Sequence, residues 1–135
     1  MIKIKKILLP SLVLLAACTG VHSYKKAEDA QDAGREFIRA SLDGDYDKAN
    51  FFMYRDSTNQ MLLDKWKQDY DRMDQDQRRQ YRDADILPIN IQNVNDSTTS
   101  YTYANTYKKD TTTIKVIRVH GDWLVDFKEI LHSRK

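Results

Sequence analysis

Apolar and polar residues alternate in the last third of the chain, which predicts β-strands with one buried face. Residues 112–119 and 122–127 are rich in β-branched and aromatic side chains, and His120-Gly121 between them suits a two-residue turn. That turn predicts three cross-strand pairs on the face that we take to be the core: Arg118–Trp123, Val116–Val125 and Ile114–Phe127.

Two further strands are expected upstream, at residues 86–94 and 98–108. Pro88 lacks a backbone N–H, so the first of them should be an edge strand. A three-residue turn between the two strands would bring Ile89 and Ile91 to the core face. A loop at Lys109-Asp110 would bring two tyrosines to the same face, in the pairs Tyr103–Val116 and Tyr101–Arg118.

The first half of the chain shows helical spacing of apolar residues instead. Residues 27–42 carry an apolar stripe that includes Gly34, which indicates a close crossing with a neighbouring element. Gly44 suits the left-handed position after this helix, and Asp45 caps a short helix over residues 46–53.

A third helix begins at Asp56 or Ser57. Its apolar stripe consists of Leu62, Trp66, Tyr70 and Met73. Asp74 with Gln77 three residues later forms a capping pair, so the helix should break and restart there. Residues 69–85 interleave Asp with Arg and Gln, which fits either a solvated face with ion pairs or a binding face for a charged partner. Helices followed by strands predict an α+β fold, with N-terminal helices packed on a four-stranded antiparallel meander.

The N-terminus has three lysines followed by an apolar run at residues 7–15, shorter than the ~20 residues that a membrane-spanning helix needs. The run closes with Leu15, Ala16, Ala17 and Cys18. This segment resembles a bacterial lipoprotein signal peptide with its lipobox. The resemblance implies cleavage before Cys18, an S-diacylglycerol group on its sulfur and N-acylation of the new amino terminus. An ordinary secretory signal with a chance cysteine is the alternative.

Cys18 is the only cysteine, so the exported domain has no internal disulfide and packing alone must hold it. Several acyl chains would anchor the protein stably to membrane lipid. We expect a bacterial cell-envelope location, with the outer membrane favoured and the domain outside the cytoplasm. The expected segments are a signal peptide (1–17), a lipidated cysteine and tether (18–26), one domain (27–130) and a C-terminal tail (131–135).

Removal of the signal peptide changes the charge balance. The whole chain has 22 Lys and Arg against 20 Asp and Glu, and three of the lysines lie in residues 1–17, which leaves 19 basic residues against 20 acidic ones. A nearly neutral exported protein lacks the basic surface that nucleic acid requires, so no nucleic-acid partner is expected.

Two short motifs extend the resemblance to the domain. The first helix ends in Leu42-Asp-Gly-Asp-Tyr-Asp-Lys-Ala49, and the last hairpin reads Val119-His-Gly-Asp-Trp-Leu-Val-Asp126. With the order of helices and strands, they resemble bacterial lipoproteins that carry a nuclear-transport-factor-2-like (cystatin-like) domain, many of them domains of unknown function. The resemblance implies a cone in which a curved sheet wraps around helices, a pocket at its open end and dimers through the outer face of the sheet. It implies no activity, because such folds carry binding proteins, enzymes and assembly modules alike.

Aromatic residues with polar tips favour small-molecule binding. Six residues of the inferred interior are candidates to line a pocket: Trp66, Tyr70, Tyr101, Tyr103, Arg118 and Trp123. Arg118 would offer an anion or cation–π contact. Aromatic residues at helical and strand spacing are equally typical of an ordinary core, so both interpretations stay open at this point.

A second hypothesis makes the domain a structural or assembly module of the envelope. Ile117, Val119 and Leu124 are apolar residues on the outer face of the last hairpin, and they form a candidate interface for a homodimer or a protein partner. The alternative is that the C-terminal segment of the same chain covers them.

Catalysis has less support in the sequence. The three histidines are His22 in the tether, His120 at a hairpin tip and His132 in the tail, and none lies on the inferred core face. No nucleophile motif, metal-ligand spacing or phosphate-binding loop is present, so we expect no catalytic residue, metal or cofactor. The prediction is a non-catalytic binding domain for a small molecule or a protein, with a cone-pocket enzyme of isomerase or dehydratase type as the remaining alternative.

Overall fold

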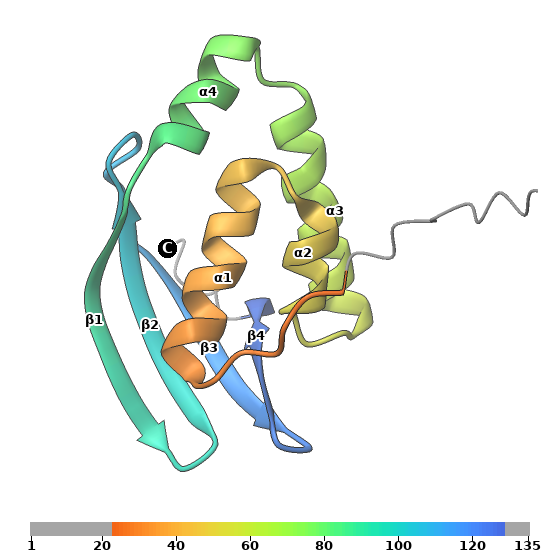
Figure 1. Ribbon diagram of the computed structural model, residues 1–135, viewed down its shortest axis with the longest axis vertical. Helices are drawn as coiled ribbons and strands as arrows, with labels where there is room; N and C mark the ends of the chain where they lie inside the picture. Colours follow the sequence, from red (N-terminus) through yellow and green to blue (C-terminus); the bar gives the residue numbers. More distant parts are fainter. Residues whose placement is uncertain (1–22, 129–135) are drawn as a thin grey trace, which may run out of the picture.

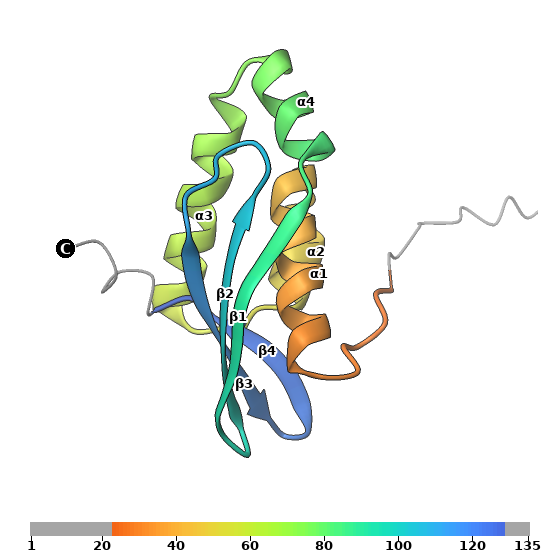
Figure 2. The same cartoon turned by 90° about the vertical axis from the view of Figure 1, so that its left-hand side faces the viewer.

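The computed structural model describes residues 23–128, in which four helices precede four strands. The elements are α1 (Ala30–Asp43), α2 (Tyr46–Phe51), α3 (Ser57–Asp71), α4 (Gln75–Asp83), β1 (Ile86–Asn95), β2 (Thr98–Asn105), β3 (Thr112–Val119) and β4 (Asp122–Asp126). The strands form one antiparallel sheet in the order β1-β2-β3-β4. The sheet is curved, and α1 lies against its concave face (Figures 1 and 2). The predicted α+β class, with helices on a four-stranded antiparallel meander, is confirmed.

Every one of these helices begins after an aspartate whose carboxylate accepts a hydrogen bond from a backbone N–H of the first turn. The four N-caps are Asp29, Asp45, Asp56 and Asp74, the last of them in a capping box with Gln77. The caps predicted for the second, third and fourth helices are therefore confirmed. The first helix begins at Ala30 rather than at residue 27, because Asp29 caps it. It ends, as predicted, at Gly44 in the left-handed conformation, with φ 75°.

The core lies between α1 and the sheet. A Cβ atom added to Gly34 would lie 3.1 Å from the ring of Tyr101 in β2, so the predicted close crossing is confirmed. The rings of Phe37 and Phe127 meet edge-on, with centroids 4.9 Å apart. The side chains that are at most 2% exposed around these contacts include Ala33, Phe37, Ile38, Tyr101, Ile114, Val116, Val125 and Phe127.

The last hairpin has the predicted register. His120 and Gly121 both have positive φ, 50° and 84°, which is the backbone conformation of a tight two-residue turn. The β3–β4 pairs are Arg118–Trp123, Val116–Val125, Ile117–Leu124, Lys115–Asp126 and Val119–Asp122. One assignment differs from expectation: Arg118 is exposed rather than part of the core, because it lies close to the His120-Gly121 turn at the tip of the hairpin.

The predicted register between β2 and β3 is wrong by four residues. The observed pairs are Tyr101–Ile114 and Tyr103–Thr112, where Tyr101–Arg118 and Tyr103–Val116 were expected. The cause is a loop over residues 106–111 in place of a tight turn at Lys109-Asp110. Asn105 starts this loop, since its side-chain oxygen accepts hydrogen bonds from the backbone N–H groups of Tyr107 and Lys108. A shift by an even number of residues leaves both tyrosines on the core face.

β1 is an edge strand, as Pro88 predicts. Ile91 pairs with Tyr101 and faces inward as expected. The expectation for Ile89 is wrong: its side chain is 55% exposed. The pairing with β2 shifts between Pro88 and Asn90, and this bulge turns Ile89 away from the core.

The far edge of the sheet is covered by the chain that follows α2. Tyr54 donates its backbone N–H to the carbonyl oxygen of Val125 at 2.8 Å, and Val125 donates to the carbonyl oxygen of Phe52 at 2.8 Å. Asn59 in α3, with no exposed surface, adds three hydrogen bonds here. Its amide group donates to the Tyr54 carbonyl and to Asp126, and its oxygen accepts from the backbone N–H of Phe127. These contacts fix α3 against the end of β4.

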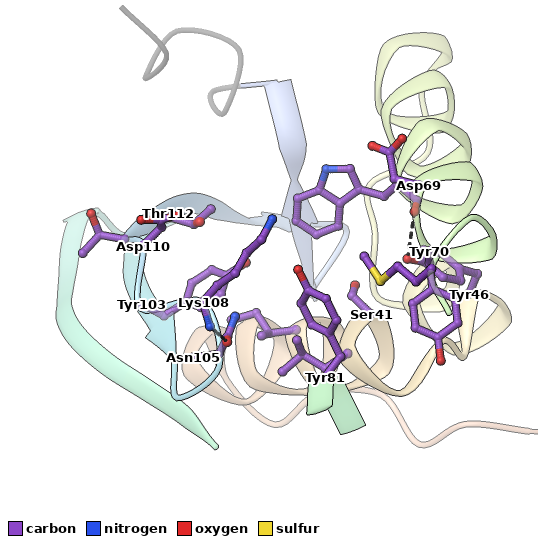
Figure 3. Close-up of a pocket in the computed structure, with 15 residues that line it drawn as sticks. Ser41, Tyr46, Asp69, Tyr70, Tyr81, Tyr103, Asn105, Lys108, Asp110 and Thr112 are labelled. Carbon is purple, nitrogen blue, oxygen red and sulfur yellow. Dashed lines mark hydrogen bonds between the residues drawn. The ribbon is translucent and has the colours of Figure 1, made fainter. Parts of the chain in front are cut away.

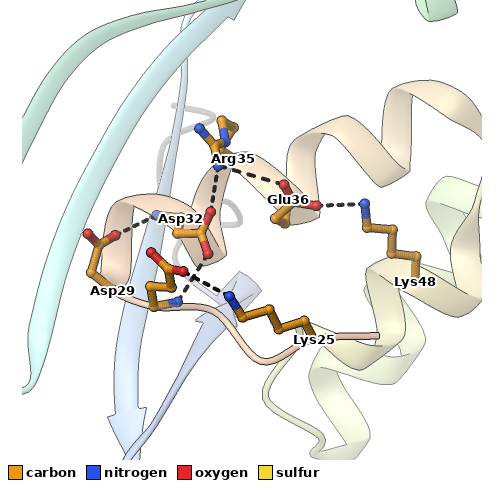
Figure 4. A network of polar contacts seen from close by, with 7 residues as sticks. Lys25, Asp29, Asp32, Arg35, Glu36 and Lys48 are labelled. Atoms are coloured by element: carbon orange, nitrogen blue, oxygen red, sulfur yellow. Dashed lines mark hydrogen bonds and ion pairs between the residues drawn. The ribbon is translucent and has the colours of Figure 1, made fainter. Parts of the chain in front are cut away.

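Charged side chains join the chain before α1 to the helices (Figure 4). Lys25 pairs with Glu28 at 2.9 Å, and the backbone N–H of Glu28 donates to the Asp32 carboxylate of α1 at 3.0 Å. In the same network Glu36 of α1 pairs with Lys48 of α2 at 2.6 Å. The ring of Tyr24 lies 5.5 Å from that of Phe51. The described part of the expected tether therefore already contacts the domain at Tyr24.

A candidate ligand pocket at the open end of the fold

A cavity of about 350 Å³ lies where α1, α3, α4 and the β2–β3 loop come together (Figure 3). Tyr103 of β2 and Ile38 of α1 line it from the core side. Trp66 and Tyr70 of α3 and Tyr81 of α4 supply aromatic walls. In Figure 1 this is the upper end of the molecule, where the helices extend beyond the sheet.

The aromatic walls are held by contacts with one another and with neighbouring rings. The hydroxyl of Tyr46 donates to the Trp66 carbonyl oxygen at 3.2 Å, and its ring lies edge-on to Tyr70 at 5.9 Å. The Trp66 ring meets Phe127 of the core edge-on at 4.6 Å. Tyr81 packs in the same way on Tyr107, at 5.0 Å. The contacts of the protein itself therefore hold these walls in place.

Burial changes the acidity of two phenols that line the cavity. It raises the pKa of Tyr103 above the ordinary value of a tyrosine, and it does the same for the pKa of Tyr46, with a smaller contribution from the neighbouring Tyr70. Both hydroxyls therefore stay protonated at neutral pH, and the Tyr46 hydroxyl uses its proton in the hydrogen bond to the Trp66 carbonyl oxygen.

Three charged side chains lie at the mouth of the cavity. Asp69 comes from α3, and Lys108 and Asp110 come from the β2–β3 loop. All three are exposed, and within residues 23–128 none of their charged groups has an ion-pair partner. Figure 3 shows the two carboxylates on opposite sides, with the Lys108 ammonium and the Tyr81 hydroxyl directed toward the middle. The mouth of the cavity therefore carries charges of both signs.

The structure brings together three of the six predicted pocket residues, Trp66, Tyr70 and Tyr103. Tyr101 does not line this cavity, because it is 1% exposed and packed beneath α1. Arg118 and Trp123 lie at the opposite end of the sheet, where the guanidinium group sits 5.6 Å from the centre of the indole ring. They form a cation–π pair with each other.

Sequence reasoning missed several lining residues: Ser41, Tyr46, Asp69, Tyr81, Asn105 and Lys108. Tyr81 carries the clearest missed signal, since it is the one aromatic residue within a helix of Asp, Arg and Gln. Such an isolated aromatic residue indicates a contact with something outside its own helix.

Two other groups of predicted residues lie elsewhere. Ile117, Val119 and Leu124 are half-buried on the outer face of the sheet, where Ile117 pairs with Leu124. Residues 129–135, the alternative cover for them, lie outside the described residues. So do the lipobox residues Leu15, Ala16 and Ala17 together with Cys18, and the histidines His22 and His132.

The described residues were also compared with the requirements of a metal site and of a membrane-spanning helix. His120 is exposed at the hairpin tip, far from the cavity. Within residues 23–128, no group of three His, Cys, Asp or Glu side chains is arranged to hold a metal ion. The helices of the same range include none that is both long and apolar enough to cross a membrane.

Comparison with protein-family models, with curated proteins and with solved structures gives no match for this chain. The class that the structure defines is an α+β domain in which N-terminal helices pack on a four-stranded antiparallel meander. The resemblance to nuclear-transport-factor-2-like lipoproteins rests on the motifs quoted above.

Proposed function

We propose that this protein is a non-catalytic binding domain of the bacterial cell envelope, which takes up a small molecule in the cavity at its open end. The observation that carries the proposal is the cavity itself. It combines aromatic walls that are packed against neighbouring rings with polar groups at the mouth, the usual composition of a small-molecule site. Its volume of about 350 Å³ lies within the range of about 300–1,000 Å³ common for such sites.

The proposal includes the anchor and the family. Cys18 would carry the lipid that holds the protein to a membrane, with the outer membrane favoured, and the domain would face away from the cytoplasm. The curved sheet around α1, with a cavity at one end, supports membership of the nuclear-transport-factor-2-like lipoproteins. Replacement of Cys18 by Ser should remove the protein from the membrane fraction. Continued acylation of this variant would refute the anchor.

Native mass spectrometry of the protein purified without denaturation tests the binding function. We expect an extra mass of small-molecule size that is lost on gentle activation. The variant Tyr81→Ala, which removes one wall of the cavity, should lose that mass, whereas Met61→Ala on the exposed side of α3 should keep it. A bare protein in all three preparations would contradict the proposal.

A specific observation favours a second candidate function, assembly through the outer face of the sheet. Ile117, Val119 and Leu124 place three apolar side chains together on that face. If this is the interface of a homodimer, Leu124→Lys should yield a folded monomer. An unchanged molecular mass of this variant in solution would exclude the interface.

A further inference from the structure

We propose that the ligand of the cavity is a neutral, polyhydroxylated ring compound of the saccharide class. This inference rests on the proposed binding function and adds the chemistry of the ligand. It follows from the charges at the mouth, the aromatic faces inside and the mixture of hydrogen-bonding groups between them.

The charges at the mouth are of both signs. Asp69 and Asp110 stand on opposite sides, and the Lys108 ammonium is directed between them (Figure 3). An ion of either sign would meet a like charge at the mouth as well as an opposite one, so the mouth does not select simply for net charge. A neutral ligand with many hydroxyl groups meets no repulsion, because hydroxyls donate to carboxylates and accept from an ammonium group.

The aromatic side chains suit a ring with apolar faces. Trp66, Tyr70 and Tyr81 line the walls, and Tyr103 lines the core side. Each of them combines a flat apolar body with a polar edge. A sugar ring has the matching construction, since C–H groups cover its faces and hydroxyls surround its rim. The aromatic rings would lie against the faces of the sugar, and the Tyr81 hydroxyl, which is directed toward the middle of the cavity, would bond to its rim.

Hydrogen-bond donors and acceptors occur together in the lining. Asn105 uses its side-chain oxygen within the β2–β3 loop, which leaves its NH₂ group as a donor on the cavity side. The Asp69 and Asp110 carboxylates are acceptors, and the Tyr81 hydroxyl is both donor and acceptor. The cavity of about 350 Å³ lies near the lower end of ligand sites, which fits a ligand of one or two rings.

The two tryptophans of the chain allow a site-specific test, because Trp66 lines the cavity and Trp123 lies at the other end of the sheet. In a Trp123→Phe protein, indole fluorescence reports on the cavity alone. The full-length protein would be kept in a polyoxyethylene detergent, which carries neither sugar nor charge. The probes are N-acetylglucosamine, glucose and cellobiose as neutral saccharides, choline as a cation and benzoate as an anion.

At least one saccharide should change the Trp66 emission in a saturable way, and choline and benzoate should not. Asp110→Asn, an exposed position that the fold does not need, should weaken the apparent affinity at least tenfold. The matched control Asp64→Asn, on the outer side of α3, should leave it unchanged. Tyr81→Ala should abolish the response, with circular dichroism as the check on folding.

The outcomes separate this inference from the proposed function. A saturable response to choline or benzoate, without one to any saccharide, overturns the saccharide class and leaves the binding function standing. If no probe changes the Trp66 emission, the saccharide class is also overturned. If native mass spectrometry also shows the protein without a bound small molecule, the proposed binding function is contradicted as well.

Discussion

The two ends of the sheet are closed in different ways. At the lower end in Figure 1, tight turns join β1 to β2 and β3 to β4, and the exposed Arg118 covers the face of Trp123. At the upper end, the loop over residues 106–111 separates β2 from β3, and α3 and α4 extend past the strands. The lower end is closed by tight turns, which depend on residues close together in the chain. The upper end depends on contacts between distant segments, and there the chain leaves a cavity.

Replacing Asn59 should have the largest effect on this arrangement. Asn59→Ala leaves the backbone N–H of Phe127 and the carbonyl of Tyr54 without their partner in a buried place, so the free energy of unfolding should fall by about 2–3 kcal/mol. The control Asn90→Ala, exposed on β1, should stay within about 0.5 kcal/mol of the wild type. Urea denaturation measures both. Equal stabilities of the two variants would mean that Asn59 does not hold α3 to the sheet.

Two glycines with positive φ, Gly121 at the hairpin end and Gly44 at the open end, allow the two ends to be compared by mutation. A Cβ atom added to Gly121 at the hairpin would meet no atom within 4 Å. The free energy of unfolding of Gly121→Ala should therefore fall by only about 1–2 kcal/mol, the cost of the left-handed conformation for a residue with a side chain. Gly44→Ala carries the same cost and also places a Cβ atom 2.5 Å from the ring of Tyr70, which must move. We expect Gly44→Ala to be the less stable variant and the one that loses the cavity ligand. Thermal unfolding and native mass spectrometry check this order, and the opposite order would contradict the packing at the open end.

Asp56, the cap of α3, gives the stability a pH dependence. The backbone N–H of Asn59, followed by the Lys128 side chain, holds the pKa of the Asp56 carboxyl below its usual range. A carboxyl whose pKa is lowered by folding stabilises the protein above its unfolded pKa of about 4, and this contribution is lost as the pH falls through the folded pKa. The stability difference between wild type and Asp56→Asn should therefore be constant near neutral pH and shrink below about pH 4. A difference that grows on acidification would show that the cap does not act through its charge.

Arg118→Ala should have the smallest effect. The side chain is exposed and its contact with Trp123 is a surface cation–π pair, worth about 0.5–1 kcal/mol. Because Arg118 lies at the hairpin end of the sheet, away from the cavity, its removal should leave ligand binding unchanged. A loss of the co-purified mass in this variant would move the site to the hairpin end.

The same contrast explains what the sequence could predict. The N-caps of α2, α3 and α4, the left-handed Gly44 and the His120-Gly121 turn depend on residues close together in the chain, and each was predicted correctly. The β2–β3 register was not, because the Asn105 side chain starts a longer loop that ends the strand three residues early. The exposure of Ile89 likewise depends on a bulge that alternation alone does not indicate.

The cavity was predicted in part for a related reason. Trp66, Tyr70 and Tyr103 belong to clear apolar stripes, so they could be assigned to the interior. Tyr81 lies in a strongly polar helix and reaches the cavity only because Arg39 of α1 holds the end of α4, through hydrogen bonds to the carbonyls of Tyr81, Arg82 and Ala84. Contacts between such distant segments leave no periodic signal in the sequence.

The central claim is that a small molecule binds at the open end and not at the hairpin end. The indole N–H signals of Trp66 and Trp123 in a two-dimensional ¹H–¹⁵N spectrum of the full-length protein report on the two ends separately. A small-molecule extract of bacterial cells should shift the Trp66 signal in a concentration-dependent way and leave the Trp123 signal in place. A shift of Trp123 alone, or of neither signal, would contradict the account.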